Sequence, residues 1–583
     1  MKTHKYLIAV FVLVAVMATS CSEDYLNINP KGTLTEDQLL NPENIDGFVT
    51  SAYAHLPNLG YWQGMVSEHV AGSMRSDDAY KGGGGLTDQS NWYYQEVFAL
   101  ATPTMGRNED TWKAIYLALS RTNVAINAVR KIDESEYPKK DERLGEVLFL
   151  RGYQYSHLKR RWRWIPYIRE DMLLENYKNV SNHPAGMVSD ISIWRNIYND
   201  FKAAAELLPD QQEDAGRPTR WAAEAFAAYA MLWMAYEQGP DHQVTNLNTA
   251  RLDTALTYLN DIINNGPYEL AEDYGNNFLP QYDGINPETV WALQFSKDDG
   301  TTNGRVNWGV ILNAPTWAPH FTCCDFHKPT HDLVNAFKTG TNGLPLFDTY
   351  LEEDINGRGA EFFAQNTFDP RLSHTVAIPG HPWKYDPDLL FDSTGARTPA
   401  QYGYFNSLKE MVHPDWAEYQ YKPSYSAPTT DEAQMRYAEV LLMKAEVLIQ
   451  LNREDEALSL INEVRERAAN STARLHFKDG TPLLDYHVEL YQPGVNCVWD
   501  KAFALNAMRW EKRLETACEG RRFYDLVRWG IAEDVMNAHF AREVQWWSWF
   551  NVAVFTAGRD EYLPIPQNQI NLSQGVYVQN PGY

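Results

Sequence analysis

Cysteine is scarce in this chain, with five residues in 583, at positions 21, 323, 324, 497 and 518. So few and so scattered cysteines exclude a disulfide-rich scaffold. The chain also has no Cys-x-x-Cys pair and no histidine cluster with zinc-ligand spacing, so we expect no metal site. The adjacent Cys323 and Cys324 could form a vicinal disulfide in an oxidising compartment, but we expect unpaired thiols.

Basic residues are also in deficit, with 51 Lys and Arg against 76 Asp and Glu and a formal net charge of −25. Removing the first 20 residues, which contain Lys2 and Lys5 but no acid, lowers this by two, to −27. So acidic a surface disfavours nucleic acid and anionic lipid as partners. The glycine run at 82–85 is not a phosphate loop, because Lys81 precedes it and no Gly-Lys-Ser/Thr follows. We therefore expect no nucleic-acid partner, and no motif calls for a cofactor.

Long apolar runs are absent beyond the start of the chain, where Lys2 and Lys5 precede an apolar stretch at 6–17. That stretch is shorter than the roughly 20 apolar residues that span a bilayer, and its flanks are those of an export signal. Small residues then lead to Cys21, a pattern typical of cleavage there and acylation of the thiol. We predict a lipoprotein signal peptide at 1–20 and a lipid anchor on Cys21. The alternative is an ordinary secretory signal with an incidental cysteine.

Helical periodicity is the dominant pattern that is present. Apolar residues recur at three- and four-residue spacing in segments at 193–208, 222–236, 255–262, 435–449 and 457–464. Thr429 and Glu432 have capping-box spacing before the fourth of these. The fold class that this predicts is mainly α.

Two of the helical segments resemble each other. The spacing of Ala255, Leu259 and Ile262 recurs in 457–464. A small residue, then a large one, then another apolar one at this spacing is typical of the second helix of a tetratricopeptide unit, which packs on the first helix through these residues. We expect a tetratricopeptide-like α-α superhelix, with generic helix-hairpin packing as the alternative.

Between the helical segments lie long polar stretches rich in Gly, Pro and aromatic residues, at about 72–107, 270–330 and 340–428. They are too long for ordinary connections, and loops carried by a rigid scaffold are where binding residues concentrate. The 19 Trp, 34 Tyr and 23 Phe exceed what a core needs, although most single rings are still expected to be buried. We predict that binding residues lie on these loops, while the length of the chain alone would allow two or more domains.

The first candidate binding loop contains Asp77, Asp78, Tyr80 and Trp92 beside four glycines. Paired carboxylates can accept hydrogen bonds from the hydroxyl groups of a ligand, and aromatic rings can offer it flat apolar faces. The glycines predict a mobile loop. The alternative is that the rings near Trp92 pack inward.

A second candidate stretch carries Trp308 and Trp317 among Gly, Pro and Asn residues, a context that a core explains less easily. A third aromatic patch at 546–550 lies beside a helical segment, where it could equally be a buried junction. We place it behind the first two. Aspartates at 298–299 and at 386–388 lack a full calcium-ligand spacing.

Family resemblance is carried mainly by WEKRLETACEGRRFYDLVRWG at 510–530, which resembles the signature of the SusD/RagB family. The stretches at 436–468, 331–337 and 368–376 and the closing LPIP…QNPGY are similar to that family too. One departure is Cys518, where the family more often has a large apolar residue.

This resemblance implies a single SusD-like domain over 21–583, in which the long loops form a binding lobe. It implies a surface lipoprotein that binds a glycan without acting as an enzyme, with the sugar site on those loops, away from the 510–530 signature. It also implies delivery to a SusC-like, TonB-dependent transporter in the outer membrane, over which the protein acts as a lid. The acidic Glu23 and Asp24 after Cys21 resemble a signal for export to the outer face. The alternatives are a helical glycoside hydrolase or lyase, and a peptide- or protein-binding surface lipoprotein.

The Glu- and Arg-rich signature itself is interpreted as a structural clamp, because guanidinium groups bind carboxylates bidentately. Glu515 and Glu519 are one helical turn apart on one face. Glycoside hydrolysis needs carboxyl groups on both sides of a sugar, with one pKa raised. We therefore expect no catalysis at this pair.

Overall fold

The structure is a computed structural model, and it describes residues 41–583 with short gaps. The gaps are 55, 57–67, 173–175, 177–178, 184–190, 298–299, 301–304, 353–354, 356–358 and 423–424. The predicted signal peptide 1–20, its Cys21 and the aspartates 298–299 lie outside the described residues. In the described part, no helix combines the length and the apolarity that crossing a membrane requires.

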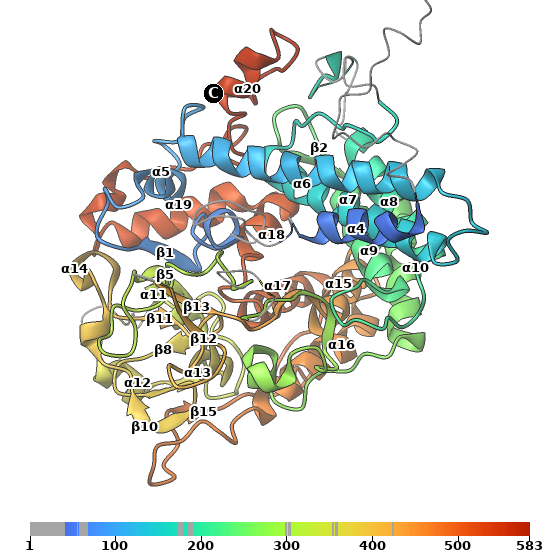
Figure 1. Cartoon of the computed structure of the whole chain (residues 1–583). Helices are drawn as coiled ribbons and strands as arrows, with labels where there is room; N and C mark the ends of the chain where they lie inside the picture. Colours follow the sequence, from blue (N-terminus) through green and yellow to red (C-terminus); the bar gives the residue numbers. More distant parts are fainter. Residues whose placement is uncertain are drawn as a thin grey trace, which may run out of the picture.

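The scaffold is a stack of long helices, which extends across the upper part of Figure 1 and down its right-hand side. Its members are α4 (Pro42–Tyr53), α6 (Gly106–Lys131), α7 (Lys140–Trp162), α8 (Ile191–Leu207), α9 (Arg220–Ala235), α10 (Thr249–Asn265), α15 (Tyr437–Gln450), α16 (Glu454–Asn470) and α17 (Lys501–Glu515). From α6 to α10 each helix packs on the next, α10 packs on α15, and α15 packs on both α16 and α17. The mainly helical, tetratricopeptide-like superhelix is thus confirmed.

The predicted packing residues explain the pairing of these helices. Ala255, Leu259 and Ile262 are buried along α10, which packs on α9. The matching residues of 457–464 are buried along α16, which packs on α15. The small alanines let the two axes approach closely, while the larger residues fill the groove between them.

One predicted helix start is wrong. Thr429 and Glu432 do not cap the helix, because Glu432 begins strand β14 (Glu432–Arg436), which pairs with β4 (Thr289–Leu293). Helix α15 begins at Tyr437, and the backbone N–H of Arg436 donates to Glu439 Oε1 at 3.2 Å. Pairing with a distant strand outweighs the local capping spacing.

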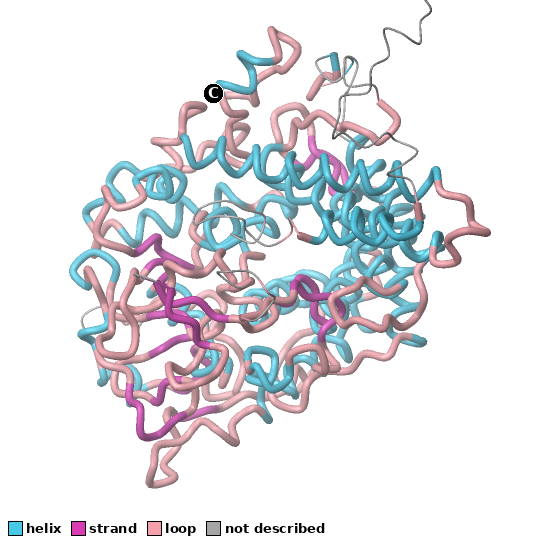
Figure 2. Tube along the Cα trace, viewed as in Figure 1, coloured by secondary structure: helices cyan, strands magenta, loops and turns pink. Residues whose placement is uncertain are grey.

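Short strands and helices accompany the stacked helices, many of them within the three predicted loop stretches, and most lie on the side opposite the stack (Figure 2). The strands are β1 (Ala79–Gly82), β2 (Tyr236–Gln238), β3 (Val244–Leu247), β5 (Phe326–Pro329), β6 (Lys338–Thr339), β7 (Thr367–Phe368), β8 (Val376–Ala377), β9 (Pro382–Trp383), β10 (Asp386–Leu390), β11 (Asn406–Ser407), β12 (Tyr419–Lys422), β13 (Tyr425–Pro428) and β15 (Asp485–Tyr486). The shorter helices are η1 (His69–Ser73), α5 (Ser90–Val97), η3 (Tyr274–Phe278), η4 (Pro280–Tyr282), α11 (His331–Ala336), α12 (Ala360–Gln365), α13 (Arg371–Thr375), η5 (Ser393–Gly395), α14 (Pro399–Tyr402), α18 (Arg522–Trp529), α19 (Ala532–Glu543), η6 (Ser548–Val552) and α20 (Gln567–Leu572). Apart from one three-stranded sheet, β15-β7-β6, the strands pair two by two.

The segment 510–530 forms the end of α17 and all of α18, and its acids Glu511, Glu515 and Asp525 are buried, while Glu519 is partly buried. Glu515 accepts hydrogen bonds from Arg371 at 3.1 Å, Arg436 at 2.7 Å and Arg467 at 2.5 Å. These arginines come from α13, from the end of β14 and from α16, so one carboxylate joins the helical scaffold to the strand-rich side. The interpretation of this segment as a structural clamp is confirmed.

Candidate functional site

The predicted loop stretches 72–107 and 270–330 meet in space, because β1 pairs with β5 in antiparallel register. Tyr80 lies opposite Lys328, and Gly82 lies opposite Phe326. Gly82 has a φ of 75°, and a Cβ there would lie 2.3 Å from the carbonyl oxygen of Asp325. Glycine is therefore required where the two stretches touch.

An apolar cluster fills the junction of these stretches. Its buried members are Val70, Met74, Trp92, Val306, Ile311, Leu312, Cys324, Phe326 and Ala427. Trp92 meets Phe326 edge to face, with ring centroids 5.3 Å apart. Trp308, Cys323 and Tyr425 are half-buried and pack against the cluster from outside. We call these three residues the Trp308 surface.

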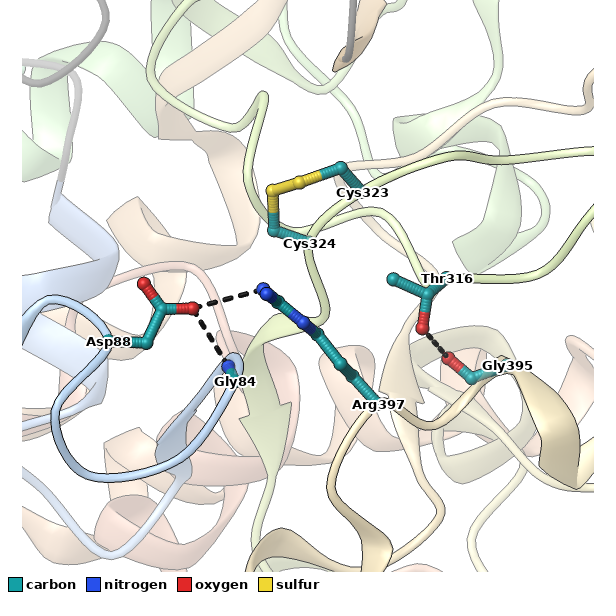
Figure 3. The surroundings of a disulfide bond; sticks show 7 residues. All are labelled: Gly84, Asp88, Thr316, Cys323, Cys324, Gly395 and Arg397. Carbon is teal, nitrogen blue, oxygen red and sulfur yellow. Dashed lines mark hydrogen bonds and ion pairs between the residues drawn. A yellow bond between two sulfur atoms is a disulfide. The ribbon is translucent and has the colours of Figure 1, made fainter.

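A disulfide joins Cys323 to Cys324 and forms part of this surface. The expectation of unpaired thiols at these positions is therefore wrong. Around the disulfide lie Gly84, Asp88 and Arg397, which come from two different loops (Figure 3). Asp88 Oδ2 accepts from the backbone N–H of Gly84 at 2.8 Å and from Arg397 Nη1 at 3.0 Å. Polar groups thus border the apolar sulfur and ring atoms.

The glycine loop at 82–85 is closed around a buried lysine. Lys81 Nζ donates to the carbonyl oxygens of Gly82, Gly85 and Asp88 at 2.7 to 3.0 Å. Burial lowers the pKa of Lys81 to about 8. The glycines serve this tight turn, in which Gly82, Gly83 and Gly85 all have positive φ. The loop is therefore held in place by hydrogen bonds, in contrast to the mobile loop expected from its glycines.

Asp77 and Asp78 are not presented to a ligand in this structure. Both are buried, Asp77 accepts from Arg522 at 2.9 Å, and Asp78 accepts from Arg513 at 3.2 Å. Burial raises the pKa of Asp78 to about 6, although Arg513 lies beside it. The predicted sugar-binding carboxylates instead anchor their loop to the 510–530 segment. Sequence reasoning missed this because the arginines lie more than 400 residues further along the chain.

Three of the four predicted ring contacts are core residues. Tyr80 is 1% exposed and donates to Glu543 at 2.5 Å, while Trp92 is 8% exposed. Trp317 is 6% exposed and packs on Trp383 and on a neighbouring phenylalanine. Trp308 is the one predicted ring that the structure leaves half-buried at the surface.

A second feature is a cavity of about 800 Å³ beside the strand-rich side. Its lining includes Phe363, His381, Tyr404, Phe405, Leu484 and Trp547. Tyr404 is 50% exposed, and it was missed because one tyrosine in a long aromatic stretch carries no distinguishing pattern. In the third predicted patch, Trp547 borders this cavity, whereas Trp549 and Phe550 stack on each other in the core at 3.8 Å.

The carboxyl pair at Glu515 and Glu519 does not suit acid catalysis. Burial alone would raise the pKa of each group, but the charges of Arg436 and its neighbours hold both pKa values below the usual 4.5. Neither carboxyl is therefore a protonated acid near neutral pH, as glycoside hydrolysis would require of one partner.

Comparisons with known proteins show the family to which the chain belongs. Residues 287–583 match the model of the SusD family, and residues 24–232 match a family described as starch-binding and associating with the outer membrane. SusD-like protein P25 of Formosa agariphila is 22% identical to this chain over 553 residues, which are 91% of each protein. A SusD-like protein of Bacteroides ovatus is 24% identical over 62% of this chain and 60% of its own length.

Solved structures show the same fold. A SusD superfamily protein from Bacteroides vulgatus superposes with a TM-score of 0.67 at 20% identity, over 93% of this chain and 99% of that one. A laminarin-binding SusD-like protein superposes with a TM-score of 0.65 at 21% identity, over 93% of this chain and 100% of that one. Surface glycan-binding protein A from Bacteroides thetaiotaomicron, in complex with laminarihexaose, superposes with a TM-score of 0.61 at 19% identity, over 93% of this chain and 99% of that one. Since the family model covers the C-terminal half of the chain and the fold extends over nearly all of it, the chain belongs to the SusD family.

Proposed function

We propose that this protein binds a glycan at the cell surface, without cleaving it, and passes it to a SusC-like, TonB-dependent outer-membrane transporter. The observation that carries the glycan-binding proposal is the Trp308 surface, together with membership of the SusD family. Two relatives of the same fold are described as laminarin-binding and as complexed with laminarihexaose. Handover to a transporter rests on the family resemblance alone.

The chemistry of the Trp308 surface suits a carbohydrate. The indole of Trp308, the phenol ring of Tyr425 and the side chain of Cys323 offer apolar area to the C–H face of a sugar. Asp88 and Arg397 stand beside that area, with side chains 30% and 41% exposed, and can exchange hydrogen bonds with hydroxyl groups. We propose Trp308 as the contacting ring, with buried Trp92 supporting it from beneath.

The purified protein is expected to retain a soluble polysaccharide in affinity electrophoresis and to release no reducing ends during long incubation. The physical reason is that the carboxyl pair considered for hydrolysis is ion-paired and ionised. A panel that includes laminarin, starch and xylan checks both points at once. Turnover that one Asp or Glu substitution abolishes would favour the hydrolase alternative, and competition by peptides would favour the peptide-binding one.

Membrane attachment is proposed to depend on Cys21, which lies outside the described residues. Cys21→Ala is expected to leave the fold unchanged and to release the protein from the outer membrane, because acylation of this thiol supplies the anchor. Cell fractionation in a strain without the partner transporter checks this, with melting of the purified variant as the control for folding. A variant that still sediments with the outer membrane there would refute the lipid anchor.

A further inference from the structure

Two histidines and a glutamate from three separate segments converge next to the apolar cluster on which the Trp308 surface packs. His69 directly precedes Val70, and His327 directly follows Phe326, and both of these apolar residues belong to that cluster. His69 begins η1, His327 lies on β5, and Glu410 follows β11 by three positions. One potential ligand atom from each residue lies within 4.8 Å of those from the other two. We propose that His69, His327 and Glu410 bind a divalent transition-metal cation.

The histidines have donor atoms to spare. His327 is fully buried and His69 is 7% exposed, and their ring centroids lie 4.4 Å apart. Among the described residues, three ring nitrogens have no hydrogen-bond partner: Nδ1 and Nε2 of His69, and Nε2 of His327. Buried polar atoms without partners are costly, and a cation that accepts their lone pairs removes that cost.

Glu410 is placed to serve as the third ligand. Its Oε1 lies 2.5 Å from His327 Nδ1, and its Oε2 lies 3.5 Å from His69 Nε2. Asn313 donates to Oε2 at 2.6 Å, which fixes the orientation of the carboxylate. Hydrogen bonds of this kind behind a ligand are typical of metal sites, where they hold the coordinating group in position.

The surroundings favour a cation over an anion. A small cavity of about 70 Å³ reaches His69 and Glu410, and its wall also includes Asp283, Asp431 and Glu432. The lysine in that wall, Lys409, is bound to Glu519 at 2.7 Å. The cavity leaves room for water as a fourth ligand, as in zinc sites with three protein ligands.

The ligand set selects among cations. Two imidazoles and one carboxylate suit Zn²⁺, Fe²⁺, Co²⁺ or Ni²⁺, whereas Ca²⁺ and Mg²⁺ prefer oxygen ligands alone. The other buried cluster of this type, at Asp332, His539 and Glu543, differs in one decisive respect. Its carboxylates are already neutralised by Arg513 and Arg542, which would repel a cation.

A cation at this site would brace the glycan-binding surface from below. Strand β5 carries His327 and also Phe326, on which Trp92 packs. Joining β5 to η1 and to the segment after β11 would stabilise the three segments against one another. The three ligands are assembled in the native state and not in the unfolded chain. Because the cation therefore binds the native state preferentially, metal binding is expected to raise the melting temperature.

The test uses the purified protein after dialysis against a chelator, with Zn²⁺ as the probe. Calorimetric titration is expected to give one ion per chain, and melting is expected to shift upward with Zn²⁺ and hardly at all with Ca²⁺. His69→Ala and Glu410→Gln are expected to weaken zinc binding at least tenfold. His413→Ala is the matched control, since its imidazole pairs with Asp386 at the start of β10, and it should bind zinc like the wild type.

Two outcomes would overturn the proposal. One is a wild-type protein that takes up no Zn²⁺, and the other is undiminished uptake by both ligand variants. Should those variants fail to fold, Co²⁺ added to the wild-type protein decides the matter through its visible absorption. Bands typical of four-coordinate nitrogen and oxygen ligation support the site, and the spectrum of hydrated Co²⁺ contradicts it.

Discussion

Glu515→Ala is expected to lower the free energy of unfolding by about 3 to 5 kcal/mol, the usual cost of removing one partner from a buried ion pair. Glu515 is fully buried, and it accepts hydrogen bonds from Arg371, Arg436 and Arg467. Its removal leaves these guanidinium groups with less negative charge in a region that water does not reach. Thermal melting at a fixed scan rate, together with urea unfolding, measures the loss.

The control for this prediction is an exposed pair of the same kind. Arg453 and Glu456 are bonded on the surface of α16, so Glu456→Ala should melt close to the wild type. Equal melting temperatures for Glu515→Ala and Glu456→Ala would contradict the clamp.

The clamp also carries a pH dependence. Although burial alone would raise the pKa of Glu515, the charges of Arg467, Arg436 and Arg371 hold it well below 4.5. A carboxyl whose folded pKa is lowered stabilises the fold fully above its unfolded pKa, and this stabilisation is lost as the pH falls toward the folded value. The difference in stability between the wild type and Glu515→Ala should therefore shrink as the pH drops below about 4.5.

Trp308→Ala is expected to weaken glycan retention several-fold or abolish it while the melting temperature stays near that of the wild type. Aromatic contacts contribute about 0.5 to 1.5 kcal/mol beyond buried area in protein pairs, and a ring against a sugar face should matter at least as much. Trp317→Ala should behave in the opposite way. Trp317 is buried among other rings, so its truncation costs about 3 to 5 kcal/mol and lowers the melting temperature clearly.

The comparison of these two variants separates binding from folding. Affinity electrophoresis measures glycan binding, and differential scanning fluorimetry measures the stability of the fold. Tyr404→Ala serves as the matched surface variant, because Tyr404 is half exposed beside the 800 Å³ cavity. If Trp308→Ala retains the glycan and Tyr404→Ala or Trp547→Ala does not, the glycan site is the cavity and our assignment is wrong.

The helical scaffold could be predicted because its signal is local. Ala255, Leu259 and Ile262 recur every three or four residues along one face of α10, and α9, the helix just before it in the chain, packs on α10. The clamp was also predictable, since Glu and Arg alternate in one short segment. The start of α15 was not, because β14 pairs with β4, which lies more than 130 residues earlier in the chain.

The binding surface was harder to predict for the same reason. Asp77 and Asp78 look like surface residues in their polar, glycine-rich context, yet their partners Arg513 and Arg522 lie in a distant segment. Trp92 and Trp317 are likewise covered by rings that the sequence does not place near them. Among the predicted rings, only the structure distinguishes Trp308 from these buried ones.

The most direct test of the account is a crystal structure of the protein with an oligosaccharide from the polysaccharide that it retains. The account predicts a sugar ring in van der Waals contact with Trp308, with hydroxyl groups within hydrogen-bonding distance of Asp88 or Arg397. An oligosaccharide bound in the cavity beside Tyr404 and Trp547, with the Trp308 surface left bare, would contradict it.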